Sequence, residues 1–200
     1  PGEFVIITGK SGAGKTTLFN CLTGVFSPTK GKVLFEDNDI TFKKPYEITT
    51  EGISRTFQNI RIFREMTVLE NVMIGQHTRS KEGILTAIAG TKKFRREEDE
   101  IKSTAFEYLE SVGIEDYAQI LAENLPYGYQ KRLEIARALA TEPKLLLLDE
   151  PAAGMNPQET GELMKLINRI RELGKTVIII EHDMKVVMGI SDWIIVLDHG

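Results

Sequence analysis

One glycine-rich octapeptide, residues 9–16 with the sequence GKSGAGKT, constrains this chain more than any other feature. It matches in full the pattern G-x-x-x-x-G-K-[ST], in which backbone N–H groups wrap around a phosphate. An apolar run at residues 4–8 precedes it, and an apolar-periodic segment at residues 16–23 follows it. The expected order is therefore strand, glycine loop and helix, with the positive helix N-terminus aimed at an anion.

The residue types in this loop have separate tasks. The Lys15 ammonium is expected to reach the β- and γ-phosphates, the Thr16 hydroxyl to bind magnesium, and Thr17 to add a phosphate contact. The alternative to a phosphate-binding loop is a flexible glycine turn that matches the pattern by chance, but the predicted flanking strand and helix argue against it. The residues predicted to bind the nucleotide here are Gly9, Ser11, Gly12, Ala13, Gly14, Lys15, Thr16 and Thr17.

Two adjacent carboxylates follow a second apolar run, residues 145–148. A continuous apolar run of this length is typical of a strand buried on both faces of a parallel sheet. Neighbouring side chains on a strand point in opposite directions, so the two carboxylates can do different work. We expect Asp149 to hold magnesium, directly or through water, and Glu150 to polarise the attacking water. We also expect this strand to lie beside the phosphate loop.

A helix with clear start and stop signals comes next. Asn156 is the predicted N-cap, Pro157 occupies the first turn, Glu159 completes a capping box and Gly174 follows the end. Its expected apolar face consists of Leu163, Leu166, Ile167, Ile170 and Leu173.

His182 stands at the end of the following predicted strand, residues 176–180. An imidazole at that place is suited to sense or stabilise a γ-phosphate, although a lone histidine is more often structural. His77 and His199 have no comparable context and are predicted to be surface or turn residues.

The alternation of strands and helices predicts the fold class. Such alternation implies a parallel α/β sheet with right-handed crossovers and ligands at the strand carboxyl ends. Residues 32–35 and 40–42 read as short strands around an Asp-Asn-Asp turn, and residues 68–112 are mostly helical. We expect an α/β fold: a P-loop NTPase core with a mostly parallel sheet, a small antiparallel β layer and a helical subdomain.

The charge, the single cysteine and the apolar content of the sequence argue against several classes of protein. The formal net charge is −4 with acids and bases interspersed, which argues against a nucleic-acid partner. Cys21 is the single cysteine, lies among apolar neighbours and is expected to be buried, as in a reducing cytosol. No apolar stretch approaches the roughly 20 residues that a membrane span needs. Both ends look cut, at Pro1-Gly2 and at Asp198-His199-Gly200.

Taken together, the motifs resemble the ATP-binding cassette (ABC) family over nearly the whole chain. Lys15 and Thr16 match its Walker A motif, and Gln58, within Arg-Thr-Phe-Gln, matches its Q-loop. Asp149 and Glu150 match the Walker B pair, and His182 matches the switch histidine, in the family's order. Residues 125–139 resemble the signature motif and the helix that follows it.

The resemblance implies a role for each matched residue. It implies Mg-dependent ATP hydrolysis with Glu150, His182, Lys15 and Gln58 as the catalytic set. It assigns magnesium to Thr16, Gln58 and Asp149, and adds Gln58, Asp149 and His182 to the nucleotide-binding residues. The nucleotide-binding core is expected at residues 1–59 and 131–200, and the helical subdomain with the signature at residues 60–130.

The resemblance also implies partners. Two cassettes, identical or different, would pair head to tail, each burying ATP between its own P-loop and the other's signature. Transmembrane permease subunits would touch the helical subdomain, and an external solute-binding protein would be an indirect partner. The location implied is cytoplasmic, peripheral on the inner face of the cell membrane. Within the family, residues 149–157 and 180–184 look most like the ATPase subunit of branched-chain amino acid importers.

The chain departs from the family pattern at four positions. Pro126 replaces the signature serine, Tyr127 its first glycine and Tyr129 its glutamine, while Asn156 stands where aspartate is usual. Proline has neither a hydroxyl nor an N–H to donate, so the γ-phosphate clasp offered to a partner should be weakened. The aromatic residue that stacks on adenine in the family would precede Pro1.

Other classes explain less of the sequence. Chromosome and repair ATPases carry a long coiled coil between P-loop and signature, whereas the interval from Lys15 to Leu125 shows no sustained heptads. A small-molecule kinase or a GTPase leaves Gln58, the signature helix and His182 unexplained. A non-hydrolysing regulatory module leaves Glu150 unexplained.

Overall fold

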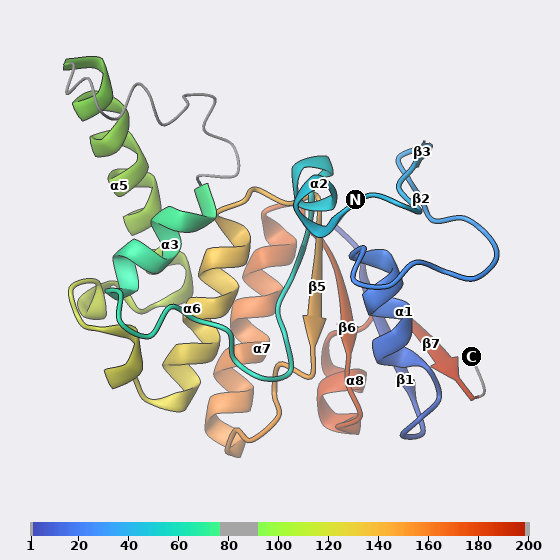
Figure 1. Ribbon diagram of the computed structural model, residues 1–200. Coiled ribbons are helices and arrows are strands. Elements are labelled where there is room, and N and C mark those ends of the chain that lie inside the picture. Colours follow the sequence, from blue (N-terminus) through green and yellow to red (C-terminus); the bar gives the residue numbers. More distant parts are fainter. Residues whose placement is uncertain (1, 77–91, 199–200) are drawn as a thin grey trace. The chain divides into compact units, whose positions relative to one another are not determined.

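The computed structural model describes residues 2–76 and 92–198, and these form two compact units (Figure 1). The first joins Pro1–Asn59 to Pro143–Gly200, and the second is Ile60–Glu142. A boundary at residue 131, as expected from the sequence, would cut the helix α6 (Tyr127–Leu139), which packs along its length with the other helices of the second unit. His77 and His199 lie outside the described residues.

The first unit is built on a parallel sheet of five strands in the order β4-β5-β6-β1-β7. The strands are β1 (Phe4–Gly9), β4 (Ile53–Arg55), β5 (Leu145–Asp149), β6 (Thr176–Ile180) and β7 (Trp193–Leu197). β5 is not the direct neighbour of β1, the strand that leads into the phosphate loop, because β6 lies between β5 and β1. The register nevertheless keeps their carboxyl ends level, since Ile180 pairs with Ile7 on one side and with Asp149 on the other.

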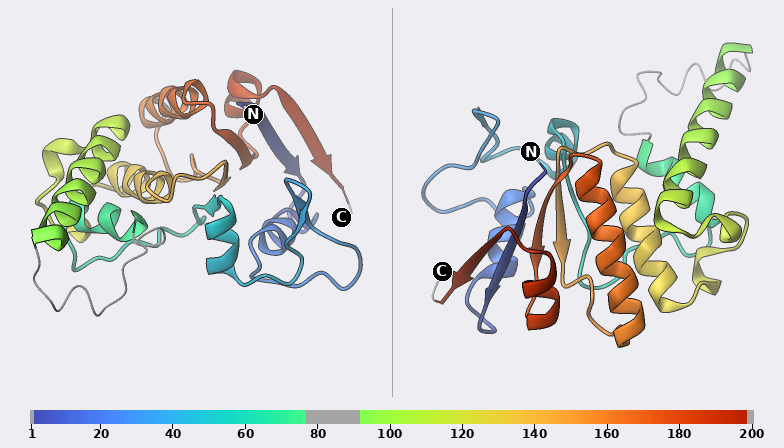
Figure 2. Two further views of the ribbon diagram at one scale, coloured as in Figure 1. Left: turned by 90° about the horizontal axis from the view of Figure 1, so that it is seen from above. Right: turned by 180° about the vertical axis from the view of Figure 1, so that it is seen from behind.

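Helices cover both faces of this sheet. Figure 2 shows α1 (Lys15–Leu22) and α2 (Pro45–Glu51) on one face, and α7 (Pro157–Glu172) and α8 (Met184–Ile190) on the other. The core between the sheet and the helices α1 and α2 consists of Ile7, Phe19, Ile40, Ile48, Ile53, Leu147 and Ile180. Burying an Ile, Leu or Phe side chain stabilises the fold by about 1.5–3 kcal/mol.

Two details of this unit differ from expectation. Leu173, predicted on the buried face of α7, is 64% exposed because it is the C-cap, beyond the last helical turn. Cys21, predicted to be buried, is only half-buried on α1.

The small antiparallel layer is a hairpin of β2 (Leu34–Phe35) and β3 (Asn38–Asp39). Its turn is Glu36-Asp37, with φ of 48° and 65°, rather than the predicted Asp-Asn-Asp. Two successive residues with positive φ give the turn whose twist matches that of paired strands. Asn38 and Asp39 are therefore strand residues.

Among the described residues of the second unit, three helices pack together: α3 (Val68–Gln76), α5 (Lys92–Val112) and α6. Two short 3₁₀ helices, Glu115–Tyr117 and Ala122–Asn124, connect α5 to α6. α3 and α6 approach closely at Gly75, where a Cβ would lie 2.5 Å from the carbonyl oxygen of Arg137. In the described part of the chain, no helix is long and apolar enough to cross a membrane.

The predicted start of α7 is confirmed in atomic detail. The Asn156 side chain accepts hydrogen bonds from the backbone N–H of Gln158 and of Glu159, and Glu159 Oε2 accepts the Asn156 N–H. We expect Asn156→Ala to lower the free energy of unfolding by about 1 kcal/mol, because these donors lose their acceptor. Urea unfolding measures this loss.

Two control variants test whether the loss of stability comes from the cap. Gln158→Ala changes an exposed side chain two residues after Asn156 and should leave the free energy of unfolding almost unchanged. Asn156→Asp keeps an equally good cap and should also be neutral. Equal losses in all three variants would contradict the capping role.

Candidate functional site

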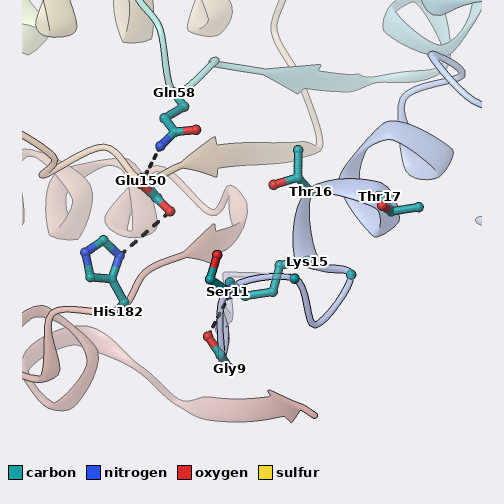
Figure 3. Close-up of a pocket in the computed structure, with 10 residues that line it drawn as sticks. Gly9, Ser11, Lys15, Thr16, Thr17, Gln58, Glu150 and His182 are labelled. Atoms are coloured by element: carbon teal, nitrogen blue, oxygen red, sulfur yellow. Dashed lines mark hydrogen bonds and ion pairs between the residues drawn. The ribbon is translucent and has the colours of Figure 1, made fainter. Parts of the chain in front are cut away.

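A pocket of about 580 Å³ opens at the carboxyl ends of the strands of the first unit (Figure 3). Four segments contribute its walls: the loop from β1 into α1, and the segments that follow β4, β5 and β6. The residues that line it are Gly9, Ser11, Gly12, Gly14, Lys15, Thr16, Thr17, Gln58, Glu150 and His182.

The loop between β1 and α1 is shaped by glycines. Gly14, the N-cap of α1, has φ 97°, and Gly9 has φ 149° with its Cα against the Leu197 carbonyl, where a Cβ would lie 2.0 Å from the oxygen. Only glycine meets both demands without strain. The loop therefore curls back on itself, and the Lys15 ammonium donates to the Gly9 carbonyl at 2.7 Å and the Lys10 carbonyl at 2.9 Å.

Glu150 is the centre of the opposite wall. It directly follows β5 in a left-handed conformation, φ 46°, and its N–H donates to the Ile180 carbonyl. Gln58 Nε2 donates to Glu150 Oε2 at 2.8 Å, and His182 Nδ1 lies 3.8 Å from Glu150 Oε1. Figure 3 shows these three side chains gathered across the pocket from Lys15. An amide, an imidazole and a carboxylate thus converge on the side of the pocket opposite Lys15.

Asp149 is placed differently from its neighbour. Its side chain is 4% exposed and forms an ion pair with Arg55, Nη2 to Oδ2, at 2.7 Å. It does not line the pocket, and neither does Ala13, which is buried and whose N–H donates to the Lys10 carbonyl. The structure therefore brings ten of the predicted residues to one pocket and places Asp149 and Ala13 behind its wall.

A further buried carboxylate stands behind the wall. Glu181 is 1% exposed, and it accepts hydrogen bonds from the backbone N–H of Ala152 and of His182, at 3.0 and 3.1 Å. It thereby ties the loop after Glu150 to the backbone that carries the histidine. The sequence does not predict a role for Glu181 or Arg55, because charged residues are usually exposed and burial leaves no local signal.

The residues of the pocket fit a magnesium-bound triphosphate. One ammonium group and a helix N-terminus attract the phosphates. The Thr16 hydroxyl, the Gln58 amide oxygen and the Glu150 carboxylate are hard oxygen donors, the kind that Mg²⁺ prefers beside phosphate oxygens. Gly12 has nothing within 4 Å of the position of a Cβ, so the mouth of the loop is open to a ligand.

The signature-like segment belongs to the second unit. Leu125 is buried, Pro126 is the N-cap of α6 without a side-chain capping bond, and Tyr127, the first helical residue, is 45% exposed. Tyr129 packs on Tyr117 with ring centroids 4.9 Å apart. The first turn of α6 thus has no capping side chain, and the N–H groups of Tyr129 and Gln130 donate to the Pro126 carbonyl.

Comparison with known proteins gives consistent matches. A family model described as ABC transporter matches residues 1–153. The high-affinity branched-chain amino acid transport ATP-binding protein LivG of Escherichia coli (strain K12) is 48% identical over 201 residues, covering 100% of this chain and 79% of LivG.

Solved structures agree with the sequence matches. A nucleotide-free ATP-binding cassette from an ABC transporter has a TM-score of 0.83 and 36% identity, covering 100% of this chain and 78% of that one. The cassette MJ0796, in a dimeric post-hydrolysis state bound to ADP and Pi, has a TM-score of 0.81 and 30% identity, covering 100% of this chain and 82% of its own.

Proposed function

Because this chain belongs to the ABC transporter family and is an ATP-hydrolysing subunit, we propose that it powers the import of branched-chain amino acids. One observation carries the proposal: a single pocket joins the Lys15 ammonium and a helix N-terminus to the Gln58–Glu150–His182 cluster. The amino-acid substrate class is proposed from the likeness to LivG, whose name states that substrate.

In this proposal the phosphate loop binds the phosphates of ATP, and the side chains on the opposite side of the pocket promote hydrolysis. Lys15 exchanges its contacts with the Gly9 and Lys10 carbonyls for the β- and γ-phosphates, and Thr17 adds a hydroxyl contact. Glu150 acts as general base: it holds the attacking water and accepts its proton as the bond to the γ-phosphate forms. Gln58 keeps the Glu150 carboxylate oriented through its 2.8 Å hydrogen bond, and His182 stabilises the γ-phosphate.

Magnesium would be held by Thr16 and Gln58, with Asp149 acting through water from behind the wall. When bound, Mg²⁺ neutralises phosphate charge during the transfer. The hydroxyl of Thr16 lies on the side of the loop that faces Glu150 in Figure 3, which supports this arrangement.

The proposal includes partners. A second cassette, identical or different, would complete each ATP site from its signature segment, and MJ0796 is a relative solved as a dimer. Permease subunits would hold the protein at the inner face of the membrane, with an external solute-binding protein beyond them. Because Pro126 lacks a hydroxyl and an N–H, this chain offers its partner a weaker phosphate clasp than a signature serine would.

Reconstitution tests the proposed substrate. The full-length protein is purified with the membrane subunits that copurify with it and placed in proteoliposomes loaded with Mg-ATP. We expect ATP-dependent uptake of leucine, isoleucine and valine, and no uptake of a basic amino acid such as lysine. ATP hydrolysis without uptake of any of the three would contradict the substrate class while leaving the ATPase intact.

A further inference from the structure

Arg55 is a charged residue in an unusual place. It ends β4, the edge strand of the sheet, and its side chain is only 5% exposed. A buried guanidinium is costly unless its charge and its donors are matched. The groups around the Arg55 side chain therefore determine whether its burial is tolerated.

The guanidinium is fixed from four directions. Nη2 donates to Asp149 Oδ2 and Nη1 to Asn20 Oδ1, both at 2.7 Å. Its central carbon lies 5.3 Å from the centroid of the Phe19 ring and 5.0 Å from that of the Phe57 ring. Nη1 also donates to Thr23 Oγ1 at 3.4 Å. A planar fork held by these oxygen acceptors and two aromatic rings has one orientation available, and lysine cannot reproduce it.

These partners come from three segments that each supply a wall of the pocket. Asn20 and Phe19 lie on α1, which begins with Lys15 and Thr16. Phe57 precedes Gln58, and Asp149 precedes Glu150. The ion pair joins positions 94 residues apart in the chain. Arg55 thus joins helix α1, the glutamine segment and the carboxylate pair.

We propose that Arg55 is a positioning residue for the magnesium side of the site, an inference that rests on the proposed ATPase function. It holds the Asp149 carboxylate at a fixed place against α1, so that Thr16, Gln58 and Asp149 are in register for the metal before nucleotide arrives. Groups that orient metal-binding residues commonly change metal affinity or activity by about 10- to 100-fold when removed. Nucleotide binding without metal depends on Lys15 and the loop, which Arg55 does not contact.

The gain in nucleotide affinity that Mg²⁺ provides is the quantity to measure. Calorimetry with the non-hydrolysable analogue AMP-PNP, in MgCl₂ and in EDTA, gives the ratio of the two dissociation constants for each purified full-length variant. Arg55→Met should reduce this ratio by about 10-fold or more and leave the affinity in EDTA within about threefold of the wild type. Arg55→Lys and Asn20→Ala should each reduce this ratio by less. The first keeps a positive charge beside Asp149, and the second keeps the ion pair between Arg55 and Asp149.

A matched control separates positioning from stability. Arg171 pairs with Asp192 at 2.6 Å and lies over the Phe4 ring, at the opposite end of the sheet from the pocket. Arg171→Met should lower the melting temperature without changing the magnesium ratio. If Arg55→Met does not fold, Arg55→Lys and Asn20→Ala carry the test.

Two different results would overturn the inference. An unchanged magnesium ratio in every folded variant at Arg55 and Asn20, beside a lowered melting temperature, would leave Arg55 a purely structural residue. Absence of any magnesium effect in the wild type would instead overturn the proposed site, and this inference with it.

Discussion

Glu150→Gln should bind ATP as the wild type does and lower kcat by about 10²- to 10⁴-fold, the usual contribution of a general base. The amide keeps the volume and can still accept the hydrogen bond from Gln58 Nε2, so the pocket keeps its shape. It cannot take a proton from water. Phosphate release by the reconstituted transporter measures kcat, and calorimetry measures ATP binding.

Glu172→Gln is the matched control for this variant. It makes the same chemical change at an exposed position at the end of α7, and its turnover should equal that of the wild type. If Glu150→Gln turned over normally, Glu150 would have no role as base. If it lost ATP binding together with turnover, the carboxylate would serve the binding step instead.

Lys15→Ala should weaken ATP binding by at least about 100-fold. Lys15 supplies the ammonium group that lines the pocket, and each hydrogen bond from a charged donor to phosphate is worth about 1.5–3 kcal/mol. Two such bonds correspond to roughly 10²- to 10⁴-fold in the dissociation constant. Titration with a fluorescent ATP analogue measures the loss.

The same loop offers the control. Lys10 carries the same charge a few residues earlier, but its side chain is 83% exposed and reaches Asp198 at 3.6 Å, away from the lining residues. Lys10→Ala should change the affinity by less than about threefold, as exposed ion pairs contribute little. Comparable losses in both variants would mean that general charge attraction, and not a positioned ammonium, binds the phosphates.

The features that could be predicted from sequence are those whose causes lie within a few residues. Glycines at fixed spacing permit the loop of residues 9–16, and the caps of α7 satisfy neighbouring N–H groups. The apolar run that ends at Asp149 is a strand because continuous apolar character suits a buried position in a parallel sheet. The α/β fold class followed from the alternation of such segments, and it is confirmed.

Only the tertiary structure decided how these segments meet. β4 has three residues, too few to show a pattern, and the strand order that puts β6 between β5 and β1 depends on hydrogen bonds between distant segments. The burial of Arg55 follows from that order, and it draws Asp149 behind the pocket wall while Glu150 faces the pocket. Local chemistry determined which groups this chain offers to a phosphate, and non-local packing determined which of them reach it.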